Sequence, residues 1–175
     1  MTRCRVGVSV GAHEFAAWWD GRGWETTLPV GPTSDAIRDA TAELKLLVGV
    51  DSRASLHVAI LPPLVRVRRV VLPRMNKNDL RLAVETNAHQ YFVGVGDAPI
   101  CGAVIPQKTG RRATFSVLAF AADSKLVESI AVGLETEGWT IRRIVPGQFA
   151  WANAMVRQQP GLAKGDARLG IRLPG

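Results

Sequence analysis

The sequence predicts an α/β (α+β) fold with two subdomains. Residues 5–61 show the pattern of three short strands, a helix and a further strand, and after residue 63 the order becomes β-α-β-β-α-β. The chain has 175 residues, of which 47% are hydrophobic. This is enough for one sizeable core or two small ones in a soluble globular protein.

Residues 5–28 are predicted to form a three-stranded meander. Apolar residues alternate over residues 5–10, a glycine-containing turn follows, and His13 to Trp19 supplies an aromatic-rich second strand. A third strand covers residues 23–28. Prolines and a glycine then break the pattern.

The first helix is predicted to begin at Thr33 or Ser34, because either side chain can accept a hydrogen bond from the first turn. It runs through Leu47. Its apolar face consists of residues at helical spacing: Ile37, Ala40, Leu44 and Leu47. Residues 55–61 then form a short buried strand, which a pair of prolines ends.

Residues 64–145 are predicted to form a βαββαβ subdomain, with two helices on one face of a four-stranded antiparallel sheet. A strand over residues 64–72 leads to a helix over residues 77–92, and Asn76 is a good N-cap for that helix. Two strands follow, over residues 100–106 and 114–121, joined by a polar turn at residues 109–112.

The second helix of this subdomain is predicted to begin at Asp123 or Ser124 and to end at Gly138, where positive φ is easiest for glycine. The last strand covers residues 139–145. A further helix is predicted over residues 148–158, followed by a flexible tail.

The formal net charge of +7 could indicate an anionic partner, such as nucleic acid, an acidic protein or a membrane surface. The basic residues lie in small scattered groups, without a long run or a known nucleic-acid-binding motif. We therefore expect no specific nucleic-acid binding. No apolar run has the length of a membrane span, and the N-terminus has no signal-peptide core, so we expect the chain in the cytoplasm.

Catalytic and metal sites are not expected. The two cysteines, Cys4 and Cys101, do not form a Cys-x-x-Cys motif, which argues against a disulfide framework and a zinc site. The three histidines lie on different predicted elements without a cluster of carboxylates. No serine or cysteine has the sequence setting of a nucleophile.

The first hairpin is a weak candidate for phosphate binding. A glycine-bearing turn can hold phosphate oxygens on its backbone N–H groups, because glycine permits close approach. The candidate residues are Gly7, Ser9, Gly11, Ala12 and His13. Any tight hairpin needs a permissive turn, so the same residues also suit a purely structural role.

Several stretches carry a family resemblance. They are Val6 to Gly11, Leu72-Pro73, the helix from Ala83 to Tyr91, Val117 to Ala122, Leu126 to Trp139, and Phe149 to Ala152. Together they resemble the actin-like ATPase superfamily, in the branch of the PilM proteins of type IV pilus assembly. That branch includes the cytoplasmic part of the type II secretion protein GspL and, more distantly, FtsA. The resemblance covers residues 3–157.

The resemblance implies a partial actin-like (ribonuclease H-like) fold. Residues 1–62 and 146–158 would form subdomain 1A, residues 63–145 the inserted subdomain 1C, and residues 159–175 the tail. Nucleotide-binding members carry an aspartate at the position of Ser9, and serine lacks the charge that helps to hold Mg²⁺. The second half of that fold is not represented in these residues. We therefore expect no cofactor and no hydrolysis; the alternative is a nucleotide-binding, possibly truncated, actin-like ATPase.

The resemblance also implies a function. It predicts a non-catalytic cytoplasmic assembly or scaffold protein of a type IV pilus or type II secretion-like machine. Its partner would be a PilN-like cytoplasmic segment of an inner-membrane protein, held between subdomains 1A and 1C. The candidate partner-binding residues are Arg66, Arg68, Arg74, Tyr91 and Phe92. The positive charge favours a position near anionic lipid heads, and apolar surface left by the missing half favours a homodimer.

Overall fold

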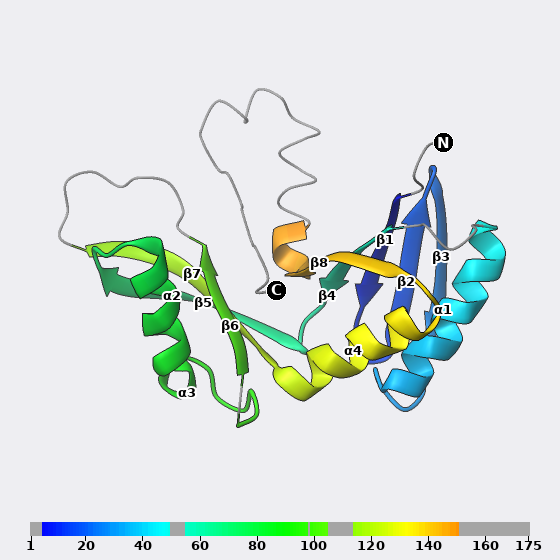
Figure 1. The fold of residues 1–175 in the computed structure, drawn as a ribbon. Helices are drawn as coiled ribbons and strands as arrows, with labels where there is room; N and C mark the ends of the chain where they lie inside the picture. The colour runs from blue at the N-terminus through cyan, green and yellow to red at the C-terminus, as the bar shows by residue number, and fades with distance from the viewer. Residues whose placement is uncertain (1–4, 50–54, 98, 105–113, 151–175) are drawn as a thin grey trace. The chain divides into compact units, whose positions relative to one another are not determined.

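The computed structural model describes residues 5–49, 55–97, 99–104 and 114–150. These residues form two compact units (Figure 1). Of the described residues, unit 1 takes those within 5–64 and 125–147, and unit 2 those within 65–124 and 148–150. The predicted turn at residues 109–112, most of the helix over 148–158 and the tail lie outside the described residues.

Unit 1 is built on a five-stranded mixed sheet in the order β3-β2-β1-β4-β8. Its strands are β1 (Arg5–Val10), β2 (Glu14–Trp19), β3 (Arg22–Thr27), β4 (Ser55–Ile60) and β8 (Thr140–Pro146). The first three strands form an antiparallel meander, while β4 is parallel to both β1 and β8. The predicted α/β class and the N-terminal meander are confirmed.

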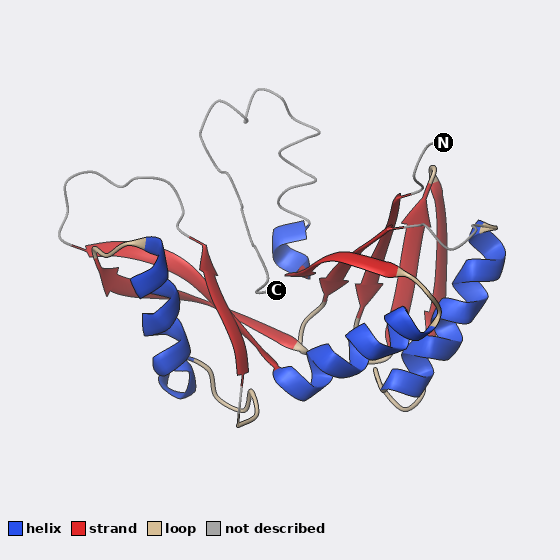
Figure 2. Ribbon diagram, viewed as in Figure 1, coloured by secondary structure: helices blue, strands red, loops and turns tan. Residues whose placement is uncertain are grey.

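Two helices supply the rest of the unit 1 core, α1 (Ser34–Val48) and α4 (Ser124–Thr136). Figure 2 shows them as the two long helices beside the five-stranded sheet. Thr33 caps α1 by accepting a hydrogen bond from the Ala36 N–H at 3.2 Å. The helices bury side chains that include Ile37, Leu44, Ile130 and Leu134. Apolar residues that lie side by side on adjacent strands of the sheet are buried together, for example Ala17, Val8 and Val58 on β2, β1 and β4.

The close approach of α1 and α4 explains the glycine at position 133. A Cβ atom there would lie 2.6 Å from the carbonyl oxygen of Ser34 and 2.8 Å from the Cβ of Ile37. The Lys45 ammonium also donates a hydrogen bond of 2.7 Å to the carbonyl oxygen of Glu137, just beyond the end of α4. This bond satisfies one of the carbonyls that a helix end leaves without an intrahelical partner.

The pairing predicted for the last strand is wrong. The sequence predicts residues 139–145 as the fourth strand of an antiparallel sheet in the second subdomain. β8 instead pairs in parallel with β4, from Ser55 and Thr140 to Ile60 and Pro146. Ile144 then lies beside Val58 and is buried with it. Local alternation marks a strand without naming its neighbour, and here burial against unit 1 decides the neighbour.

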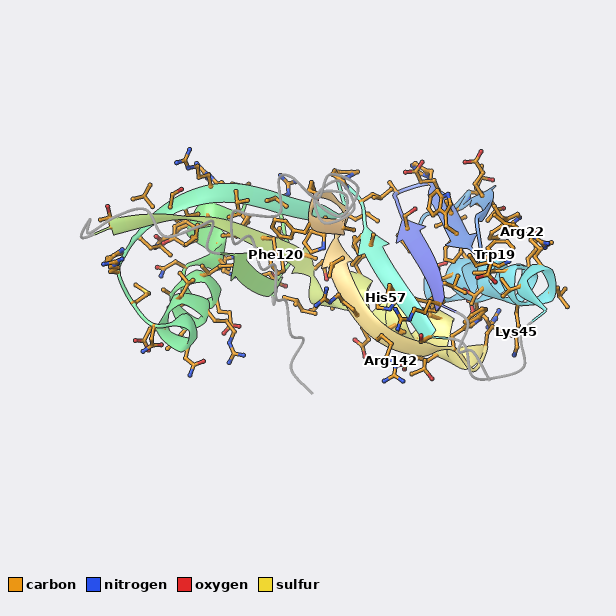
Figure 3. All side chains as sticks on the ribbon, turned by 90° about the horizontal axis from the view of Figure 1, so that it is seen from above. Trp19, Arg22, Lys45, His57, Phe120 and Arg142 are labelled. Carbon is orange, nitrogen blue, oxygen red and sulfur yellow. The ribbon has the colours of Figure 1, made fainter. Side chains whose placement is uncertain are left out.

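Unit 2 is a three-stranded antiparallel sheet in the order β5-β7-β6, with α2 against it. Its elements are β5 (Val65–Pro73), α2 (Lys77–Thr86), α3 (Ala88–Tyr91), β6 (Pro99–Val104) and β7 (Thr114–Asp123). The core includes Val70, Leu72, Leu80, Val84 and Val117. Phe120, labelled in Figure 3, packs edge-on against Phe149, with ring centroids 5.6 Å apart.

The helix predicted over residues 77–92 is divided at Asn87. Its start is as predicted, since the Asn76 side chain accepts hydrogen bonds from the N–H groups of Asn78 and Asp79. At Asn87, the side-chain amide donates to the carbonyl oxygen of Ala83 at 2.8 Å, while its own N–H reaches the same oxygen only at 3.3 Å. An asparagine side chain that competes for a backbone carbonyl in this way disrupts the helical pattern.

We predict that Gly133→Ala destabilises the protein. Glycine to alanine inside an exposed helix normally stabilises by about 0.5–1 kcal/mol. Here the added methyl group meets the Ser34 carbonyl and Ile37, so overpacking of about 1–3 kcal/mol should reverse the sign. Urea unfolding followed by circular dichroism measures the change. Val132→Ala, at the exposed neighbouring position, is the control; an unchanged or raised stability of Gly133→Ala contradicts the close approach.

We predict that Cys101 reacts slowly with alkylating agents in the folded protein. Burial, and second the nearby charge of Glu85, raises the pKa of the Cys101 thiol from 9.0 to about 11. The folded state therefore holds this proton more tightly than the unfolded chain. The resulting stability is present below about pH 9 and lost as the pH rises toward 11.

Iodoacetamide labelling of a Cys4→Ser variant tests the prediction, because it leaves one thiol in the chain. In the folded protein the rate should still rise between pH 9 and pH 10, whereas in urea it should level off near the ordinary thiol pKa. Glu85→Gln should shift the folded profile to lower pH. Identical profiles in the folded and unfolded states would refute the buried setting of the thiol.

Candidate functional site

The candidate phosphate hairpin joins β1 to β2, and the N–H of its Gly11 is already hydrogen-bonded within the turn. The Gly11 N–H donates to the carbonyl oxygen of Glu14 at 2.8 Å, and the Leu61 N–H donates to that of Val10 at 2.8 Å. The carbonyl oxygen of His13 accepts from the Leu28 N–H at 2.9 Å. The donor at Gly11 is therefore used inside the hairpin. Gly7 and Ser9 lie in β1, on the face opposite Val8.

Glu14 is the residue of this hairpin that sequence reasoning missed. A Cβ at Gly11 would lie 2.5 Å from its Cγ and 2.8 Å from its Oε1, so the Glu14 side chain lies against Gly11. This contact explains the glycine. It also places a carboxylate where the hairpin would have to accept a phosphate, and like charges repel. The available signal was an acidic residue directly after a glycine-bearing turn.

The hairpin also lacks a ligand set for a cation. Ser9 is buried and uncharged. Within the described residues there is no group of three or more His, Cys, Asp or Glu side chains that could hold a metal ion. Ala12 and His13 complete the turn, and the His13 ring lies 3.4 Å from the carbonyl oxygen of Leu28. The arrangement is that of a closed structural hairpin.

The second set of candidate residues gathers along β5 in unit 2. Arg66 and Arg68 are exposed. They are an even number of residues away from the core residues Val70 and Leu72, so they lie on the same face of the sheet, the one that α2 covers. The Arg68 guanidinium donates a hydrogen bond of 3.1 Å to the carbonyl oxygen of Tyr91. The structure therefore brings Arg68 and Tyr91 together, and this bond satisfies a carbonyl at the end of α3.

The remaining candidates differ in exposure. Arg74 is exposed directly after β5, and Tyr91 is half-buried at the edge of the unit 2 core. Phe92 is 3% exposed and belongs to that core. The expectation that Phe92 faces a partner is therefore corrected. An aromatic residue at a helix end can close a core as well as form a surface, and the sequence pattern does not separate the two.

Sequence reasoning missed the other face of β5. Arg69 is exposed there and its Nε donates to the Ser116 hydroxyl, while Val71 is 65% exposed. The signal was the consecutive pair Arg68-Arg69, because neighbouring strand residues point to opposite faces. Both faces of β5 therefore carry arginine.

The positive charge of β5 is not neutralised by neighbours in the described part of the chain. Ion pairs form there at Arg38 and Arg81, for example, but none involves Arg66, Arg68 or Arg69. None of the helices in the described residues has the length and apolar composition of a membrane-spanning segment. What these residues can do chemically is attract carboxylates or phosphates at an exposed strand.

Comparisons with known proteins give a match in structure. No protein-family model matches the chain, and no curated protein matches its sequence. The structure of a PilM-PilN type IV pilus biogenesis complex matches with a TM-score of 0.68 and 16% identity, over 88% of this chain and 50% of that one. The cytoplasmic domain of EpsL, an inner-membrane component of the type II secretion system of Vibrio cholerae, matches with a TM-score of 0.50.

The likeness is one of fold. The EpsL match has 10% identity and covers 82% of this chain and 57% of that one, so the chain spans about half the length of the two matched structures. The likeness in fold that the sequence indicates, to PilM and to the cytoplasmic part of a type II secretion protein, is confirmed. The resemblance to FtsA stays a prediction.

We predict that Arg68 stabilises unit 2 through its hydrogen bond to Tyr91. Arg68→Ala should lower the free energy of unfolding by about 0.5–1.5 kcal/mol, because the carbonyl of Tyr91 loses a charged donor. Arg66→Ala is the matched control on the same strand and face, and should change stability by less than about 0.5 kcal/mol. Urea unfolding measures both variants. If the two substitutions lower the stability equally, the hydrogen bond from Arg68 to Tyr91 does not stabilise unit 2 as predicted.

Proposed function

We propose that this chain is a non-catalytic assembly or scaffold component of a type IV pilus or type II secretion-like machine. It binds the cytoplasmic segment of an inner-membrane partner, and that segment is PilN-like. The observation that carries the proposal is the fold likeness to the PilM-PilN complex, with a TM-score of 0.68 over 88% of the chain. The exposed arginines of β5 give such a segment a charged place to bind.

The hairpin geometry supports binding of a protein rather than catalysis on a nucleotide. Phosphate binding at a hairpin depends on free N–H donors and on a metal-binding carboxylate. Here the Gly11 N–H is used within the turn, Ser9 stands at the metal position of the related ATPases, and Glu14 adds a repelling charge. A nucleotide at this hairpin would be held weakly, and the described residues of the hairpin offer no carboxylate at the metal position for hydrolysis.

The net charge supports a location at the cytoplasmic surface of the inner membrane. With a formal charge of +7 the chain is attracted to the anionic lipids of an inner-membrane surface, so it acts in the cytoplasm, peripheral to that membrane. Such a position brings it to the cytoplasmic end of a membrane-embedded partner. Self-association into a homodimer belongs to the same proposal, and sedimentation analysis measures it.

Fluorescence anisotropy with labelled peptides tests the proposed partner. The peptides are the cytoplasmic ends of membrane proteins encoded beside this chain, each with a scrambled version of the same composition. We expect saturable binding of one peptide, at least tenfold tighter than its scrambled control, which corresponds to about 1.4 kcal/mol. If no peptide binds better than its scrambled version, the docking proposal is wrong.

Calorimetry with Mg-ATP tests the alternative, a nucleotide-binding actin-like ATPase. The observation that favours this alternative is the glycine-bearing hairpin. We expect no measurable binding, because the Gly11 N–H is engaged within the turn and the Glu14 carboxylate lies beside it. Glu14→Gln is the matched variant that removes the repelling charge. If Mg-ATP binds the unmodified chain with micromolar affinity and the Gly11→Val variant loses this binding, the proposal of a non-catalytic protein is wrong.

A further inference from the structure

Within the described part of unit 2, β5 is an edge strand with one paired side. The sheet order is β5-β7-β6, and the nine residues of β5 pair with β7 along their whole length, from Val65 and Ala122 to Pro73 and Thr114. In an antiparallel pair, every second residue of an edge strand points its N–H and C=O groups away from its neighbour. These groups form a template for one more strand.

The side chains that flank this edge differ between its two faces. On the face that α2 covers, Arg66 and Arg68 are exposed. On the opposite face Val67 is half-buried and Val71 is 65% exposed, with Arg69 between them. An exposed valine on a long edge strand is unusual, because proteins normally protect such edges with charge or proline. The edge therefore offers cations on one face and an apolar contact on the other.

We infer that the outer edge of β5 binds an extended acidic peptide by strand addition. In an added strand, alternate side chains would lie beside Arg66 and Arg68 on one face and beside Val67 and Val71 on the other. The ligand is thus a segment in which carboxylates alternate with apolar, β-branched residues. This inference rests on the proposed function and names the site and the chemistry of its partner segment.

The charges favour this occupant over a second copy of the chain. Pairing β5 with β5 of another copy would bring the arginines of both onto one pair of strands, and β5 contains no carboxylate to offset them. Like charges at neighbouring positions destabilise such a pair, whereas opposite charges stabilise it. The same arginines thus keep the edge from self-association and select an acidic partner.

A fluorescein-labelled nonapeptide in which glutamate and valine alternate is the probe, with anisotropy as the readout on the full chain. We expect saturable binding, and no binding of the corresponding lysine and valine peptide. Two further probes carry N-methyl groups on either the odd or the even amides. Since an added strand uses every second N–H, one of these should bind and the other should lose at least tenfold in affinity. Equal binding of both would overturn strand addition.

Charge variants locate the site. Arg66→Gln should lower the affinity for the glutamate and valine probe roughly two- to fivefold, and the double variant Arg66→Gln with Arg68→Gln should lower it roughly tenfold. Arg142→Gln is the matched control, because Arg142 is an exposed strand arginine on β8 of unit 1 (Figure 3). Arg66 makes no hydrogen bond to the described residues, so its variant should fold normally, and thermal unfolding checks this. A loss in Arg142→Gln equal to that in Arg66→Gln would mean general charge attraction and would overturn the inference.

The outcomes separate this inference from the proposed function. If a membrane-protein peptide binds but keeps its affinity in the double variant, the function stands and the β5 site is wrong. If the glutamate and valine probe binds at β5 while every membrane-protein peptide fails, the site stands and the function is wrong. Concentration-dependent dimerisation that Arg66→Glu enhances, without probe binding, would assign the edge to a second copy and overturn the inference.

Discussion

The parallel pairing of β8 with β4 is the constraint on which unit 1 depends. It places β4 between two parallel neighbours, β1 and β8, and completes the five-stranded sheet. Parallel neighbours cannot be joined by a tight turn and need a crossover, and the chain between β4 and β8 ends in α4. The close contact at Gly133 then fixes how near α4 lies to α1. Sheet and helices are therefore positioned together.

Features of the fold that local chemistry decides could be predicted from the sequence. Asn76 and Thr33 cap helices because their side chains reach N–H groups two or three residues away, and Gly138 ends α4 with a positive φ. The neighbour of β8 could not be predicted in this way. Its choice depends on buried surface contributed by β4 and α4, far away in sequence. At Asn87 the helix periodicity continued, and a single side-chain hydrogen bond overrode it.

The candidate sites were predictable to a similar extent. The sequence predicted the strand that carries Arg66 and Arg68, and both are exposed there. It did not predict that they share a face with the core residues Val70 and Leu72. It missed that β5 lies at a sheet edge, since strand order is not written in any local pattern. It also took Phe92 for a surface residue, although the loop after α3 buries it with Val95. At the hairpin, glycine spacing indicated the turn, but only the folded backbone shows that Gly11 and Glu14 are hydrogen-bonded.

The strand pairing at the start of unit 2 has a consequence for the order of folding. Val65 and Ala122 are paired across β5 and β7, so the chain enters and leaves this unit at neighbouring points. Pairing β4 with β8 closes a loop that contains residues 65–124 of unit 2, and the entropic cost of closure rises by roughly 0.6 kcal/mol for each doubling of loop length. Once unit 2 has folded, its ends are already held together and the effective loop is short. Folding of unit 2 would thus speed the pairing of β4 with β8 in unit 1, because it shortens the effective loop between them.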